Sequence, residues 1–261
     1  MRFNNPVLCL IGKSGAGKSS ALDMLLMKSG IDCSIGKVTY STDRPKRSEN
    51  DSEYEFFDNA GELEAYRSDC INDGIDIISD QRYRVMSNGK NKGEWRYILT
   101  SDHIFNKKSD VRVIASSVSQ YIDILNYCRN KLTGDCANDM DDHFTPIPVV
   151  IDSYDNLRVL KIVERILKNH DLDKIDKKDL LSSLEEVKRR EIYQNENVIS
   201  FKSLFKSFDD YYTEFFSNGE KRFDSATSLY VLNTYNRMQL SNRLDGILDF
   251  IGVYDDYDEF D

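Results

Sequence analysis

The chain has 261 residues, of which 40% are hydrophobic and 31% charged, a balance typical of a globular protein rather than a disordered one. Its 45 Asp and Glu against 35 Lys and Arg give a formal net charge of −10, which argues against a broad basic surface for nucleic acid or anionic lipid. Five cysteines without CxxC spacing, and no apolar run of membrane-spanning length, lead us to expect neither a disulfide framework, a zinc site nor a membrane anchor, and a cytoplasmic location.

The strongest motif lies near the N-terminus, between an apolar strand pattern at 7–11 and a helix-forming run at 21–26. Residues 12–19 satisfy G-x-x-x-x-G-K-[ST], in which glycines let successive N–H groups line an anion-sized nest at the positive end of the helix. A nucleoside triphosphate is the expected guest. Lys18 would reach its β- and γ-phosphates, and the Ser19 hydroxyl would be a ligand of Mg²⁺. The residues predicted to bind ATP are Gly12, Lys13, Ser14, Gly15, Ala16, Gly17, Lys18, Ser19 and Ser20.

The stretch after this helix predicts a small mixed α and β insertion. Asn88-Gly89 is a hairpin signal between two strand-like runs. In chain order we expect a strand at 36–42, a short strand at 54–57, a helix at 62–70, an extended region at 76–86 and a returning strand at 95–99.

Beyond residue 110, strand and helix patterns alternate, which predicts a parallel sheet covered by helices on both faces, with chemistry at the carboxyl ends of its strands. A charged break at 171–178 precedes a basic helix and is a hinge candidate. The expected elements are strands at 111–115, 147–151 and 229–233 and helices at 118–130, 159–166, 201–216 and 240–251, followed by an acidic tail.

Two further motifs follow the glycine-rich loop with fitting order and spacing. Ser41-Thr42-Asp43-Arg44-Pro45-Lys46-Arg47 and Glu53-Tyr54-Glu55-Phe56 resemble S-x-T-T-R-x-P-R and D-Y-x-F of the guanylate kinase family. The resemblance implies an α/β P-loop NTPase fold in one guanylate-kinase-like domain over 1–261. Its implied parts are a core (1–36, 109–168 and 225–252), a nucleoside monophosphate (NMP)-binding insertion (37–108), a lid and helical region (169–224) and the tail (253–261).

The resemblance also implies an activity, the Mg²⁺-dependent transfer of the γ-phosphate of ATP to (d)GMP in nucleotide metabolism, with small-molecule nucleotides as the partners. Guanidinium groups suit this chemistry because the acceptor phosphate is a dianion that must approach a triphosphate. The implied acceptor-binding residues are Ser41, Arg44, Arg47, Tyr54 and Asp80, and the implied catalytic residues are Lys18, Arg44, Arg47, Arg165 and Arg189. For Arg189, a solvated helix face is an equally good interpretation.

The chain departs from the family where its members read guanine and orient Mg²⁺. Ser116 stands near the position of an expected aspartate, and Asp152, at the end of a neighbouring strand, is the candidate replacement. Two alternatives therefore stay open: a P-loop kinase for another (d)NMP or a sugar phosphate, and a guanylate-kinase-like binding module without catalysis.

Overall fold

A computed structural model of the chain describes residues 3, 5–13, 15–30, 33–46, 49, 52, 54–87, 90–105, 109–133, 143–168, 181, 185, 201–215 and 228–253. Several predicted features lie outside these residues. They are Ser14, Arg47, Arg189 with most of the proposed lid, and the tail from 254 onward; Arg165 belongs to a described helix, but its side chain is outside the description.

The core is a parallel sheet in which β1 (Pro6–Ile11) is the central strand. The order is β2-β7-β1-β8-β9, with β2 at Ile35–Lys37, β7 at Val111–Ser116, β8 at Thr145–Asp152 and β9 at Tyr230–Leu232. Leu10 pairs with Ala115 on one side and with Val149 on the other. Every residue of β1 is buried, as expected for a parallel strand covered on both faces.

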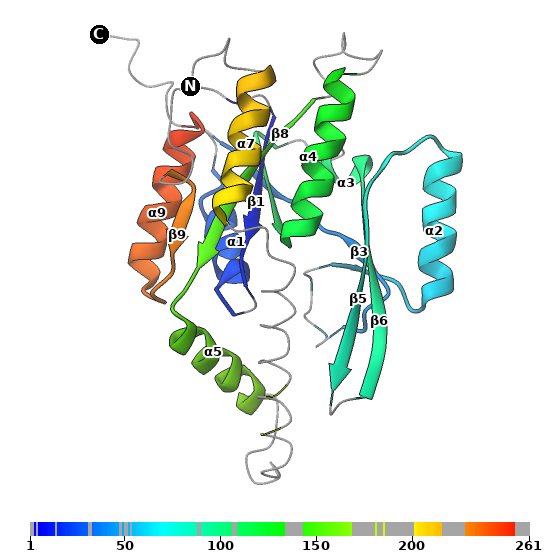
Figure 1. Cartoon of the computed structure of the whole chain (residues 1–261), viewed down its shortest axis with the longest axis horizontal. Coiled ribbons are helices and arrows are strands. Elements are labelled where there is room, and N and C mark those ends of the chain that lie inside the picture. Colours follow the sequence, from blue (N-terminus) through cyan, green and yellow to red (C-terminus); the bar gives the residue numbers. More distant parts are fainter. Residues whose placement is uncertain are drawn as a thin grey trace.

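Right-handed crossovers place helices on both faces of this sheet. From β1 the chain passes through α1 (Lys18–Met27) toward β2, whereas from β7 it passes through α4 (Val118–Thr133) in the opposite direction to β8. Connections between parallel strands are right-handed. Two such connections that run in opposite directions across the sheet therefore place their helices, α1 and α4, on opposite faces. Accordingly α1 packs with α9 (Arg237–Phe250), and α4 packs with α7 (Phe201–Phe215), as Figure 1 shows. The predicted α/β core with a parallel sheet is confirmed.

A second sheet lies beside the core, next to α4 (Figure 1). Its order is β4-β3-β6-β5, with β4 at Glu55–Phe56, β3 at Ser41–Thr42, β6 at Lys90–Thr100 and β5 at Ile77–Ser87. β5 and β6 form an antiparallel hairpin in which Ser87 pairs with Lys90, so the hairpin prediction is confirmed. α2 (Ala60–Asn72) packs against this hairpin, and its N-terminus is capped by the side chain of Asn59.

Two details differ from the sequence-based expectation. The single strand expected at 36–42 is wrong, because the chain leaves the core sheet after Lys37 and enters the second sheet at Ser41. The short helix α3 (Ser101–Phe105) carries no strong periodic signal and was not expected. The helix expected at 201–216 is confirmed as α7, which packs on β8 and α4 with Leu204, Phe208 and Tyr211 buried.

The carboxyl end of the core sheet is the functional end by geometry. The loop after β1, the helix α5 (Asp155–Lys168) that follows β8, and the free end of the β5–β6 hairpin all lie at this end, and the start of β1 and the end of α9 lie at the other (Figure 1). Clefts of open parallel sheets form where the strand order changes direction, here beside β1. Among the described helices, none combines the length and apolarity needed to cross a membrane.

Candidate active site

Close packing makes two glycines of the loop after β1 irreplaceable. A β-carbon on Gly12 would lie 2.0 Å from the backbone oxygen of Ile151 on β8, so the loop leaves the sheet where only glycine fits. Gly17 has a φ of 100°, in the left-handed region, and is the residue immediately before α1. The N-terminus of a helix carries partial positive charge, so the loop in front of α1 is suited to cradle an anion.

The loop is braced by the segment that follows β9. Asn233 donates a hydrogen bond from Nδ2 to the carbonyl oxygen of Ala16 at 2.8 Å, and the hydroxyl of Tyr235 donates to the carbonyl oxygen of Gly15. A β-carbon on Gly17 would lie 2.2 Å from Nδ2 of Asn233, so these two positions are packed to fit each other. The cradle is therefore held by residues more than two hundred positions away in the chain.

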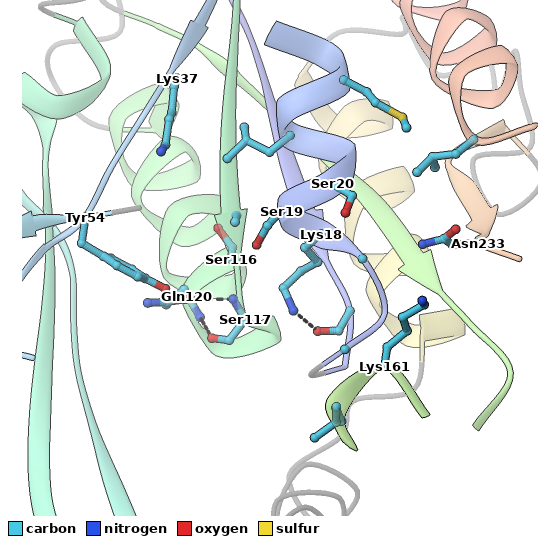
Figure 2. A pocket seen from close by; sticks show the side chains of 18 of the residues that line it. Lys18, Ser19, Ser20, Lys37, Tyr54, Ser116, Ser117, Gln120, Lys161 and Asn233 are labelled. Atoms are coloured by element: carbon cyan, nitrogen blue, oxygen red, sulfur yellow. Dashed lines mark hydrogen bonds between the residues drawn. The ribbon is translucent and has the colours of Figure 1, made fainter. Parts of the chain in front are cut away.

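Lys18 and Ser19 lie at the start of α1 and face the hollow in front of the loop (Figure 2). Nζ of Lys18 donates to the carbonyl oxygens of Gly12 at 2.5 Å and Lys13 at 3.3 Å. The ammonium group thus lies over the loop itself, within reach of an anion that the backbone N–H groups would hold. This is the arrangement that the sequence motif predicts for a triphosphate.

A cavity of about 840 Å³ extends from this loop to the second sheet. The loop side is formed by Gly12, Gly15, Gly17, Lys18, Ser19 and Ser20, the side next to α9 by Asn233, Tyr235, Asn236, Arg237 and Leu240, and the opposite side by Lys37, Tyr40, Tyr54, Tyr83, Tyr97, Ser116, Ser117 and Gln120. Figure 2 shows Tyr54, Ser117 and Gln120 across the hollow from Lys18, with Ser116 next to Ser19.

Four tyrosines form an aromatic wall on the side of the second sheet; we call Tyr40, Tyr54, Tyr83 and Tyr97 the tyrosine wall. The rings of Tyr54 and Tyr83 each meet Tyr97 edge to face, with centroids 5.3 and 5.4 Å apart. The hydroxyl of Tyr83 lies 2.8 Å from Oγ of Ser117, which joins the wall to the start of α4. Flat aromatic rings, and hydroxyl groups that rotate to donate or accept hydrogen bonds, suit the binding of a planar, polar ligand.

The charge of the cavity is opposite to that of the protein. Four cationic residues line it, whereas no Asp or Glu does so among the described residues; the cations are Lys18, Lys37, Lys161 and Arg237. The whole chain carries a formal net charge of −10. A hollow lined by one sign of charge concentrates ions of the other sign, so this cavity is built to hold anions.

Arg44 is buried beneath the tyrosine wall instead of lining the cavity, and its predicted partner Arg47 lies outside the described residues. The Arg44 guanidinium lies 5.0 Å from the ring centre of Tyr54 and 5.2 Å from that of Phe56. A cation in this position stabilises the aromatic rings that it contacts. The structure thus links Arg44 to the cavity through Tyr54, which does line it.

For the acceptor expected from the sequence, (d)GMP, replacing Arg44 with alanine should raise KM about tenfold and leave the Kd for ATP nearly unchanged, because Tyr54 loses the group it packs on. Steady-state kinetics with each substrate varied in turn, together with ATP titrations, would measure both effects. Lys46→Ala is the control, since the Lys46 ammonium lies over the Phe56 ring but is exposed. Equal damage to the binding of both substrates would contradict the assignment.

Asp80 and Ser41, both predicted to bind the acceptor, are not brought to the cavity. Side chains alternate along β5, so Tyr83 faces α4 and the cavity whereas Asp80 faces α2. Burial alone would raise the pKa of Asp80, but hydrogen bonds and ion pairs with Arg96 and Arg67 lower it. Ser41 is fully buried and donates to Glu55 at 2.6 Å.

On α5 the structure brings Lys161 to the cavity, where its ammonium lies 5.5 Å from the ring centre of Tyr235. The same helix is tied to the loop after β1, because Asp155 pairs with Arg158 at 2.9 Å and lies 3.8 Å from the Lys13 ammonium. The predicted cation on this helix, Arg165, lies one turn further along. Lys161 is thus a cation at the cavity on the same helix as the predicted catalytic residue Arg165.

Ser19 is the residue whose donor chemistry fits Mg²⁺, since a hydroxyl at the cavity edge can complete a shell otherwise made of water and phosphate oxygens. Asp152, the proposed replacement carboxylate, is used elsewhere: it accepts hydrogen bonds from the Ser153 N–H and the Tyr230 hydroxyl, both at 2.8 Å. Among the described residues no group of three or more His, Cys, Asp or Glu could hold a metal ion.

Sequence reasoning missed Lys37, Lys161, Arg237 and Gln120 as cavity residues. Lys37 ends β2, and its Nζ donates to the carbonyl oxygen of Ser52 at 2.7 Å. A signal existed for Gln120, because Ser117-x-x-Gln120 directly after a core strand is a capping-box pattern and marks a helix start at the carboxyl end of the sheet.

Of three comparisons with known proteins, only the one with solved structures gave a match. No protein-family model and no curated protein matches the chain. Among solved structures, the chain is similar to a guanylate kinase from Anaplasma phagocytophilum, with 13% sequence identity and a TM-score of 0.34 over 84% of this chain and 90% of that one. The assignment of a function therefore rests on the cavity.

Proposed function

We propose that this protein is a nucleoside monophosphate kinase of guanylate kinase type, which transfers the γ-phosphate of ATP to an acceptor such as (d)GMP. The observation that carries the proposal is the cavity itself. One hollow joins a phosphate cradle to an aromatic wall, and it is lined by cations and by no described carboxylate, in an acidic protein. Two anionic nucleotides meeting end to end need such a hollow, because their phosphates repel each other in the absence of cations.

Each part of the cavity has a role in this transfer. Phosphoryl transfer needs positioning and charge stabilisation more than covalent chemistry from the protein. The loop N–H groups and Lys18 hold the triphosphate, and Lys37 supplies positive charge on the acceptor side. Lys161 approaches from α5. When bound beside Ser19, Mg²⁺ would supply further positive charge to the phosphate oxygens.

The tyrosine wall positions the acceptor. Aromatic faces stack on a planar base and displace water, so the acceptor oxygen is held near the γ-phosphate instead of diffusing. Water is excluded from the same place, which limits hydrolysis of ATP. A nucleotide acceptor uses this wall better than a sugar phosphate, which offers no planar ring.

The test is ADP release with MgATP and each of the four deoxynucleoside monophosphates, with ribose 5-phosphate as a non-nucleotide acceptor. We expect release that depends on a nucleoside monophosphate. ADP release with ribose 5-phosphate but with none of the nucleoside monophosphates would contradict the proposal and indicate a sugar-phosphate kinase. Stabilisation by MgATP in thermal melting without any acceptor-dependent release would instead indicate a binding module.

A further inference from the structure

The amide of Gln120 has a fixed orientation at the edge of the cavity. Gln120 lies in the first turn of α4. Its side-chain Oε1 accepts a hydrogen bond from the backbone N–H of Ser117 at 2.8 Å, and its backbone N–H donates to Oγ of Ser117 at 3.2 Å. A backbone N–H can only donate, so the oxygen end of the amide must face Ser117. The nitrogen end, Nε2, is therefore turned away from Ser117.

This donor lies in a site shielded from bulk water. Gln120 is only 6% exposed, and it lines the cavity together with Ser116 and Tyr54 (Figure 2). A shielded N–H donor strongly favours a ligand that places an acceptor atom opposite it. A ligand without an acceptor there leaves the donor without a hydrogen bond to replace the one that it made to water.

The other uncharged groups on this side of the cavity discriminate less. Tyrosine and serine hydroxyls rotate and can donate or accept, so they suit either kind of base edge. A carboxylate, which only accepts, would select bases with N–H donors, but no carboxylate lines the cavity in the described part of the chain. The nearby Asp123 of α4 is held by Ser79 at 2.7 Å and by Gln81 at 2.6 Å.

We propose that Gln120 selects the acceptor base by donating a hydrogen bond from Nε2 to a ring carbonyl oxygen. The substrate class is then the keto bases: guanine presents a carbonyl at its six-position and thymine or uracil one at the four-position, where adenine and cytosine carry amino donors. Purine and pyrimidine keto nucleotides are both accepted, because the tyrosine wall stacks on either ring. This inference rests on the function proposed above and narrows its acceptor.

The test compares kcat/KM for dGMP, dTMP, dAMP and dCMP in the wild type and in Gln120→Glu. Glutamate keeps an oxygen for the Ser117 N–H, so the helix start is preserved while the donor becomes an acceptor. We expect dGMP and dTMP each to exceed dAMP and dCMP by about tenfold or more in the wild type, and this preference to fall by about tenfold or more in the variant.

Gln239→Glu is the matched control, since Gln239 occupies the same third position of helix α9 but is exposed and accepts from the Thr234 hydroxyl at 2.8 Å. It should leave the preference unchanged. If Gln120→Glu fails to fold, the wild type is tested instead with 6-thio-dGMP and 4-thio-dTMP, in which sulfur replaces the carbonyl oxygen. Sulfur is a weaker hydrogen-bond acceptor, so kcat/KM should be lower for each analogue than for dGMP or dTMP.

Two failures can be told apart. A preference for dGMP over dTMP of about a hundredfold or more, or an unchanged preference in Gln120→Glu, would overturn the role of Gln120 and leave the kinase proposal standing. Absence of turnover with all four nucleotides, while MgATP still raises the melting temperature, would overturn the kinase proposal and this inference with it.

Discussion

Replacing Lys18 with alanine should lower kcat by about three orders of magnitude while the protein stays folded. The ammonium group lies over the loop, where it donates to the carbonyl oxygens of Gly12 and Lys13, and it is the cation nearest the phosphates that the cradle would hold. Charge develops on the β- and γ-phosphate oxygens during transfer, and Lys18 can stabilise it, so the loss falls mainly on the transition state. Coupled measurement of ADP release at saturating substrates would report the change in kcat.

Stability should change much less than catalysis. Loss of two hydrogen bonds to loop carbonyls costs about 1 to 2 kcal/mol of unfolding free energy. The control is Lys206→Ala on α7, where the ammonium is exposed and pairs with Asp210 one turn away. It should leave kcat unchanged. A Lys18→Ala variant with a kcat within about threefold of wild type would contradict the role assigned to the loop.

Replacing Gly12 with alanine should destabilise the protein by about 3 kcal/mol or more and abolish stabilisation by MgATP. The added carbon would lie 2.0 Å from the backbone oxygen of Ile151, and backbone in a central strand cannot move aside as a flexible side chain can. Either β1 and β8 separate, or the loop leaves its position in the cradle. Urea unfolding with and without MgATP would measure both consequences.

Gly246→Ala is the matched control for this substitution. Gly246 lies within α9, and a β-carbon there would meet nothing within 4 Å. Alanine is the better helix former by about 1 kcal/mol, so this variant should be slightly more stable than the wild type and bind MgATP normally. Wild-type stability in Gly12→Ala, with full stabilisation by MgATP, would show that the loop does not leave the sheet as described.

The phosphate cradle could be predicted from the sequence because it is a local feature. Strand, glycine-rich turn and helix follow one another within residues 6–27, and the chemistry of the motif depends on their order alone. The hairpin of β5 and β6 was predictable for the same reason, since Asn88-Gly89 marks its position within a short segment.

Apart from Tyr54, the opposite side of the cavity was beyond prediction because it depends on contacts between distant elements. Asp80 and Tyr83 both belong to β5, and only the packing of α2 on one face and α4 on the other decides which of them meets the cavity. Lys37 and Lys161 carry no motif, and they become neighbours of the cradle through the strand order and the placement of α5. The continuous β-rich stretch at 36–42 likewise gives no sign that the chain changes sheets between Lys37 and Ser41.

The proposed transfer requires two nucleotides to occupy one cavity at the same time, and thermal melting with a bisubstrate ligand tests this most directly. Adenosine and deoxyguanosine joined through five phosphates would fill both halves at once. We predict that this compound raises the melting temperature further than saturating MgATP or saturating dGMP alone. One linked molecule loses translational and rotational entropy once on binding, whereas two separate nucleotides lose it twice. A rise no greater than that given by MgATP alone would contradict a shared cavity and leave only a nucleotide-binding loop.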